Sequence, residues 1–161
     1  AFYGCSSLSS VVIPETVTDI GSGAFNSCNK LTIGFASATQ SASLGSSWSG
    51  DSGYYYNIKE FVVYDDATYA ITNDNTAILG RYYGTATEYA ILESVNGATV
   101  TIVGKSAFRN VTALIDVSIP DSVTRIEGSA FYNCTSLESI SETMHSTILA
   151  HLPKLTLMQS T

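Results

Sequence analysis

The apolar positions of this chain follow a pattern that repeats every 23 residues near both ends. In the first copy Val11 and Ile13 lie two apart before Pro14, and the pair Ala24-Phe25 follows. The copy near the other end has matching residues at Leu114, Val117, Ile119, Pro120, Val123, Ile126, Ala130 and Phe131. A fixed period of this size is typical of a solenoid, in which successive coils stack and bury a shared core.

Each copy predicts a coil made of a strand, a corner, a second short strand and another corner. The alternation within 8–13 indicates a strand with a buried face, because residues two apart share one side of an extended chain. Pro14 ends this strand, since proline cannot donate to a sheet. Residues 17–21 predict the second extended piece. Residues 24–28 are too few for a full helix, so we expect one helical or 3₁₀ turn there.

The period breaks in the middle of the chain. Residues 35–57 are rich in Ser, Gly and Ala, which predicts an inserted loop or a poorly ordered insertion. Residues 58–99 return to strand character, with short apolar runs separated by turn signals such as Asp65-Asp66. We therefore expect a modified repeat in which at least one hairpin projects from the solenoid.

The domain organisation follows from these segments. Residues 1–140 are predicted to form a single solenoid that contains the loop of 35–57 and the modified repeat of 58–99. Residues 141–161 lose the pattern, and either a C-terminal cap or a disordered tail would fit them. Because the chain starts inside a repeat and has no signal peptide, we expect it to be a fragment whose beginning does not report its localisation.

The three cysteines occupy one position of the repeat. Cys5, Cys28 and Cys134 each follow an Ala-Phe pair at the same offset, and Val111 stands at this offset in the remaining copy. A position that takes Cys or Val indicates a small buried apolar slot. We expect free thiols, with Cys5 and Cys28 stacked in neighbouring coils; a disulfide between them is the less favoured alternative. The spacing does not suit a metal site.

Composition and charge disfavour several classes of function. Charged residues make up 13% of the chain, about half of the usual share. Ser, Thr, Asn, Gly and Tyr replace them, which suits hydroxyl-covered surfaces of secreted bacterial proteins. The net charge is -7 and the basic residues are scattered, so binding to nucleic acid or to an anionic membrane surface is not expected. No apolar run reaches about 18 residues, so no transmembrane helix is predicted.

No constellation of catalytic or metal-binding residues is visible, so neither a catalytic site nor a cofactor is expected. Gly50-Asp51-Ser52-Gly53 reproduces the sequence around the nucleophile of chymotrypsin-like proteases, but such enzymes need a His earlier in the chain. His145 and His151 come later and have no third metal ligand nearby. The acidic residues of 65–74 are explained by turns, because the spacing of a calcium loop is absent.

Aromatic residues near the break of the period are the candidates for binding a partner. Tyr and Trp provide large contact areas at a low entropic cost and are concentrated in binding hot spots. Packing against the hairpin or over the edge of a coil is the alternative for these side chains. The candidates are Trp48, Tyr54, Tyr55, Tyr56, Tyr82 and Tyr83.

The repeat also resembles a known family. The string Leu8-x-x-Val-x-Ile-Pro-x-x-Val-Thr-x-Ile-Gly-x-x-Ala-Phe-x-x-Cys-x-x-Leu31 is similar to the BspA-type leucine-rich repeat, and 114–137 carry it again with Glu127 where Gly is usual. The resemblance is strong over 1–34 and 100–140, moderate over 58–99, and absent from 35–57 and 141–161.

The resemblance implies a right-handed solenoid of leucine-rich-repeat-like coils, in a non-enzymatic protein without a cofactor. Such proteins are typically on the cell surface or secreted, in host-associated bacteria and some protozoa, and are linked with adhesion, coaggregation and protein binding. The implied partner is a protein or glycan on a host or neighbouring cell. A structural spacer that presents other domains of a longer surface protein is the alternative.

Overall fold

The computed structural model describes residues 1–39 and 42–142, and their regular structure consists of β-strands. The fold is a β-solenoid of coils about 23 residues apart, as the repeat predicts. The strands are β1 (Ser10–Ile13), β2 (Asp19–Ile20), β3 (Thr32–Phe35), β4 (Ser43–Leu44), β5 (Gly53–Tyr55), β6 (Ile58–Tyr64), β7 (Ala67–Thr72), β8 (Thr76–Tyr82), β9 (Glu88–Ala90), β10 (Ser94–Val95), β11 (Ala98–Val103), β12 (Asp116–Ile119), β13 (Arg125–Ile126) and β14 (Ser139–Glu142).

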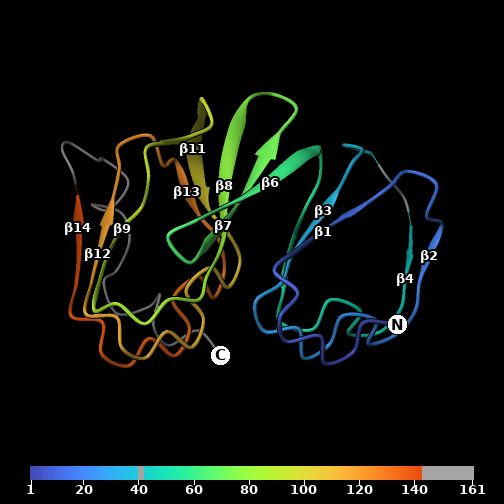
Figure 1. The fold of residues 1–161 in the computed structure, drawn as a ribbon, viewed down its shortest axis with the longest axis horizontal. Helices are drawn as coiled ribbons and strands as arrows, with labels where there is room; N and C mark the ends of the chain where they lie inside the picture. Colours follow the sequence, from blue (N-terminus) through green and yellow to red (C-terminus); the bar gives the residue numbers. More distant parts are fainter. Residues whose placement is uncertain (40–41, 143–161) are drawn as a thin grey trace.

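The N-terminal coils stack through parallel strands. β1, β3 and β5 form one sheet and β2 pairs with β4, so equivalent positions of successive coils lie side by side (Figure 1). Ile13 lies opposite Phe35 in this register, and both are buried. The Phe2 and Phe25 rings stack in parallel with their centroids 5.1 Å apart. The repeat thus places like side chains in a column, which is what buries the core.

Residues 35–57, expected to form an inserted loop, contain β4 and β5 and continue the N-terminal stack. Trp48 provides the aromatic core residue of this coil, and its carbonyl accepts a hydrogen bond of 2.8 Å from the Phe25 amide. Gly45 follows β4 as Gly21 follows β2; a Cβ on Gly45 would lie 2.7 Å from the carbonyl carbon of Gly21. Ser and Gly are tolerated here because stacking uses backbone hydrogen bonds.

The predicted hairpin is present, but it does not project. β6 and β7 are antiparallel with Tyr64 opposite Ala67, and Asp65 and Asp66 adopt φ values of 45° and 57° between them. Positive φ at both central residues is the mark of a type I′ turn. Every residue of β7 is buried, and β8 pairs antiparallel with β7 and parallel with β11. The hairpin therefore lies between the two stacks of coils (Figure 1).

The C-terminal coils repeat the arrangement of the N-terminal coils. β9, β12 and β14 form a parallel sheet, and β13 pairs with β11. Phe108 and Phe131, 23 residues apart, are fully buried and stack with ring centroids 5.0 Å apart. This matches the Phe2–Phe25 pair, as the alignment of the two copies predicts.

The expected helical turn of each coil is not formed. In its place, turns carry hydrogen bonds three residues apart, such as the amide of Cys28 to the carbonyl of Phe25 at 3.3 Å. Ser27 has a φ of 62°, and Asn133 has 59° at a similar place in its coil. A left-handed residue in the middle of the segment stops a right-handed helix from propagating.

The two stacks of coils are joined through small residues that allow close approach. A Cβ on Gly80 of β8 would lie 2.7 Å from Oγ1 of Thr32 of β3, and a Cβ on Gly34 would lie 2.9 Å from Cβ of Ile58. Tyr55 of β5 lies between the stacks in a buried cluster with Ile58, Ala70 and Ile78. This contact brings residues of distant coils to one pocket.

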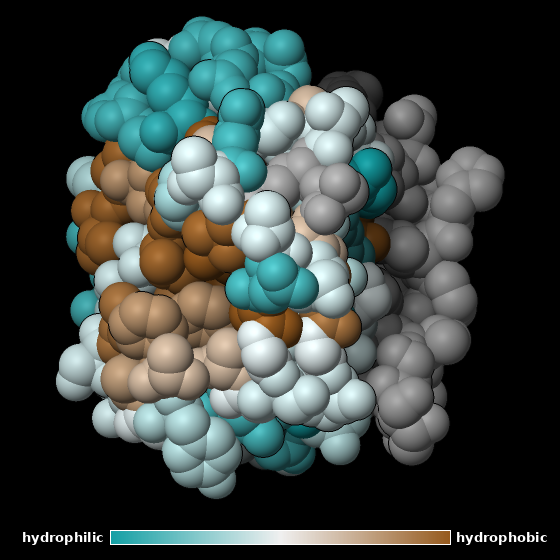
Figure 2. All heavy atoms as spheres, turned by 90° about the vertical axis from the view of Figure 1, so that its right-hand side faces the viewer, coloured by the Kyte–Doolittle hydropathy of each residue, from teal (hydrophilic) through white to brown (hydrophobic). Residues whose placement is uncertain are grey.

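Two of the three cysteines occupy the predicted slot. Cys28 and Cys134 are buried, and each thiol donates to a carbonyl of the preceding coil: Cys28 to Phe2 at 3.0 Å and Cys134 to Phe108 at 2.9 Å. Cys5 is exposed, contrary to the prediction, because the coil formed by residues 24–35 covers only one side of the first coil. Figure 2 shows this end of the molecule, on which hydrophobic residues gather. All three are free thiols.

Candidate functional site

Three of the six aromatic candidates are core residues. Trp48 meets the Phe25 and Phe35 rings edge-on, with centroids 6.3 and 5.8 Å away. Tyr82 packs against Phe108 at 5.5 Å, and Tyr55 is held between the stacks, where burial raises the pKa of its hydroxyl. All three are buried, so packing is the role that the structure gives them.

The other three candidates reach the surface. Tyr54 and Tyr56 are 36% and 40% exposed at β5, the edge strand of the N-terminal sheet. Their rings meet edge-on at 6.4 Å, and Tyr56 stacks on Phe35 at 4.9 Å, so buried neighbours hold them in place. The Lys105 ammonium lies 5.9 Å from the Tyr54 ring centroid. We call Tyr54, Tyr56 and Lys105 the aromatic edge.

Tyr83, the third candidate that reaches the surface, contacts a different lysine. The ammonium of Lys30 lies over its ring, 4.9 Å from the centroid, and the ring is partly exposed. Because Lys30 belongs to the N-terminal coils and Tyr83 follows β8, this cation–π contact bridges the two stacks.

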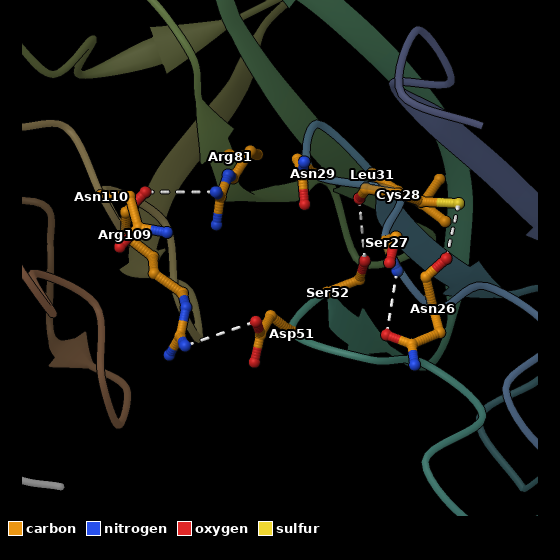
Figure 3. A pocket seen from close by; sticks show the side chains of 10 residues that line it. All are labelled: Asn26, Ser27, Cys28, Asn29, Leu31, Asp51, Ser52, Arg81, Arg109 and Asn110. Atoms are coloured by element: carbon orange, nitrogen blue, oxygen red, sulfur yellow. Dashed lines mark hydrogen bonds and ion pairs between the residues drawn. The ribbon is translucent and has the colours of Figure 1, made fainter. Parts of the chain in front are cut away.

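A polar pocket of about 90 Å³ opens where the two stacks meet. Turns of the N-terminal coils form one side, while the end of β8 and a turn of the next coil form the other (Figure 3). Figure 3 shows the two arginines opposite Asn26, Ser27 and Ser52, with Asp51 between them. The lining residues are Asn26, Ser27, Cys28, Asn29, Leu31, Asp51, Ser52, Arg81, Arg109 and Asn110.

Arg81 is the most deeply buried charge in the pocket, with 9% of its surface exposed. Its Nη1 donates to the carbonyl of Ser106 at 2.6 Å and its Nη2 to that of Arg109 at 3.1 Å. Its Nε has no hydrogen-bond partner. Burial, followed by the nearby Arg109 charge, lowers the pKa of Arg81. Burial removes the hydration of the charged guanidinium, and the like charge of Arg109 repels it, so both disfavour the charged form.

Arg109 lines the pocket and is also partly exposed at the surface. Its Nη2 lies 3.3 Å from Oδ2 of Asp51, and its guanidinium lies over the Tyr132 ring, 4.4 Å from the centroid. Its Nε is buried without a hydrogen-bond partner. The Asp51 side chain is largely exposed, so solvent weakens this ion pair.

The protease-like tetrapeptide is a turn of the third coil. Asp51 pairs with Arg109, and the Ser52 hydroxyl donates to the Cys28 carbonyl at 3.4 Å. His145 and His151 lie outside the described residues, as do the rest of 143–161, for which a cap or a disordered tail was expected. Within 1–39 and 42–142 no group of three His, Cys, Asp or Glu is placed to hold a metal ion. No helix in these ranges could span a membrane.

Sequence reasoning missed both arginines of the pocket. They are 28 residues apart, and they line one pocket with Asp51 only because β8 lies close to the N-terminal sheet. One signal was present: Arg81 interrupts the apolar run of a buried strand, where an unpaired charge is costly.

Parallel strands hydrogen-bonded from coil to coil, with aligned aromatic columns, define a leucine-rich-repeat solenoid. The family described as the BspA type leucine rich repeat region matches residues 1–47 and 83–150 in six copies, and the chain belongs to this family. The resemblance seen in the repeat is thereby confirmed. No curated protein matches the chain.

Solved leucine-rich repeat proteins of bacteria are similar to this chain. One from Bacteroides capillosus is 35% identical over 52% of this chain and 66% of that protein, with a TM-score of 0.46. One from T. pallidum is 30% identical over 51% of this chain and 39% of that protein, with a TM-score of 0.47.

A leucine rich cell surface protein from Faecalibacterium prausnitzii is similar over 87% of this chain, at 24% identity and a TM-score of 0.51. At this identity the likeness concerns the fold. The chain spans 43% of that protein, so it spans less than two thirds of each of these three proteins.

Proposed function

We propose that this domain is a non-enzymatic module of a cell-surface or secreted protein, and that it binds a protein or glycan through the aromatic edge. The observation that carries the proposal is the exposed pair Tyr54 and Tyr56, held by ring contacts with buried neighbours. Rigid aromatic side chains lose little entropy when a partner covers them. Lys105 beside Tyr54 adds a cation that suits an acidic or hydroxyl-rich partner.

Family membership and a relative described as a leucine rich cell surface protein support the surface location. The solenoid supports the mode of binding, because coils present an extended side rather than an enclosed cleft. Tyr54 belongs to β5, the edge strand of the N-terminal sheet, and Tyr56 follows directly after this strand.

The test is binding of the purified domain to a panel of extracellular matrix proteins and to a glycan array. Tyr54→Ala and Tyr56→Ala should each weaken binding at least about tenfold, the loss typical of an aromatic hot spot. Tyr64→Ala is the matched control, since Tyr64 is an exposed tyrosine of β6 outside the aromatic edge, and it should bind as the wild type does. Far-ultraviolet circular dichroism would verify that all variants fold.

The absence of any ligand in the panel, or an equal loss in Tyr64→Ala, would argue against the proposal. If no ligand binds, the domain would act as a spacer that presents other parts of a longer protein. Burial of Trp48, Tyr55 and Tyr82 favours this second function, since half of the aromatic candidates serve packing. A spacer predicts that the Tyr54→Ala and Tyr56→Ala proteins behave like the wild type in cells.

A further inference from the structure

The buried charge of Arg81 has no carboxylate partner among the residues that the structure describes. The ion pairs found within residues 1–39 and 42–142 do not include Arg81, and its guanidinium donates hydrogen bonds to two backbone carbonyls. Arginine stays protonated in proteins, so this charge persists in the pocket. Burying a charge is costly unless an opposite charge or a full set of hydrogen bonds compensates for it. The pocket therefore lacks one negative group.

The charges that line the pocket sum to +1, from Arg81 and Arg109 against Asp51. This local excess is notable in a chain whose net charge is -7. Asp51 already pairs with Arg109 and is largely exposed. An added anion would bring the lining close to neutrality and would meet two guanidinium groups at once.

Two asparagines that line the pocket carry amide groups that can donate hydrogen bonds. The Asn26 amide oxygen accepts from the Ser27 amide at 2.9 Å, and the Asn110 amide oxygen accepts from Nδ2 of Asn133 at 3.1 Å. Each of these amides also carries an NH₂ group, which can only donate hydrogen bonds. The Nε atoms of Arg81 and Arg109 are further donors without partners. Such a set matches the oxygens of an anion rather than a cation or an apolar group.

We propose that this pocket binds a small oxyanion, a carboxylate, sulfate or phosphate group, between Arg81 and Arg109. A volume of about 90 Å³ admits such a group but not a whole sugar ring with its substituents, so a larger ligand would enter by its anionic end. The anion competes with Asp51 for the Arg109 guanidinium. The inference does not depend on the proposed function, because the pocket and the aromatic edge share no residue.

The experiment measures thermal unfolding and NMR chemical shifts of the full chain during titration with sodium sulfate, sodium phosphate or sodium acetate. Sodium chloride keeps the ionic strength constant. At least one of the three anions should give a saturable shift of the unfolding midpoint, and the anion that binds identifies the class of ligand. Absence of saturation with all three would overturn the proposal.

Variants at the rim of the pocket make the test specific. Arg109→Gln should weaken the binding about tenfold, because it removes a charge-assisted hydrogen bond. Asp51→Asn should tighten binding several-fold, since it removes the competing carboxylate and raises the lining charge to +2. Arg125→Gln is the matched control, because Arg125 is exposed, pairs with Glu127 and is not part of the lining.

Unchanged affinity in Arg109→Gln, or weaker binding in Asp51→Asn, would contradict the proposed site even if an anion binds. Arg81 is not the residue to substitute first, since it also holds the carbonyls of Ser106 and Arg109 and its loss would affect folding. Loss of partner binding in the Tyr54 variants with intact anion binding would separate the two proposals.

Discussion

The ring of Tyr55 in β5 ends with its hydroxyl against Gly104, the residue that follows β11, so that the two stacks of coils touch where no side chain intervenes. A Cβ at Gly104 would also lie 2.7 Å from Cζ of Tyr55 and 3.0 Å from the carbonyl oxygen of Leu79. Tyr55 is buried and cannot move aside freely. The close contact between the stacks therefore requires glycine, a residue without a Cβ, at position 104.

Gly104→Ala should destabilise the protein by about 1–3 kcal/mol, because it overpacks this junction. The measurement is the free energy of unfolding in urea. Gly128→Ala is the matched control, since no atom lies within 4 Å of a Cβ built there and its φ is not positive. It should stay within about 0.5 kcal/mol of the wild type. Equal effects of the two substitutions would show that the junction tolerates the added methyl group.

Trp48→Ala should cost about 3–5 kcal/mol, the usual loss for a large aromatic residue removed from a core. The reason is that Trp48 provides the aromatic core residue of the third coil and contacts both Phe25 and Phe35. Trp48→Phe keeps most of this packing and should cost clearly less. A negligible change in Trp48→Ala, measured by urea unfolding, would indicate that 35–57 behave as a loop in solution.

The three thiols should differ in their reactivity toward a thiol reagent under native conditions. Cys5 is exposed and should be modified at once, while Cys28 and Cys134 are buried and should react only after unfolding. Mass spectrometry of the labelled protein would distinguish the sites. Cys5→Ser should abolish the fast phase; rapid labelling that persists in this variant would mean that the coils open readily.

Alkaline pH should destabilise the protein partly through Cys134. Burial raises the pKa of this thiol from 9.0 to about 11. The unfolded thiol loses its proton first as the pH rises, so the contribution is complete below pH 9 and is lost toward about pH 11. Urea midpoints across this window should fall less steeply for Cys134→Val, a residue that the repeat accepts at this position in Val111.

A slope should remain in the Cys134→Val protein, because burial also raises the pKa values of Tyr69 and Tyr89, whose hydroxyls share a hydrogen bond of 2.9 Å. Identical slopes in the variant and the wild type would show that Cys134 does not titrate differently on unfolding.

The repeat could be predicted from the sequence because stacking neighbours bury the same positions in every coil. Val11 and Ile13 predicted β1, the Cys28 and Cys134 slots followed from their alignment with Val111, and Asp65-Asp66 predicted the hairpin turn. The prediction of a helical turn was wrong, because its short segment contains residues such as Ser27 that adopt a left-handed conformation. The length of the segment, on which the prediction rested, does not reveal this conformation.

What the sequence determined by itself is therefore the coil: its period, its core column and the family to which it belongs. These properties are local, since each coil contacts its neighbours at a constant offset along the chain. The tertiary structure alone decided which tyrosines are buried, that 35–57 contain a coil, and that Arg81, Arg109 and Asp51 share a pocket. The coil of 35–57 depends on backbone pairing with its neighbour, which tolerates Ser and Gly. The shared pocket depends on how the two stacks pack through Gly80, Gly104 and their partners, and the 23-residue period does not predict the shape of such a contact.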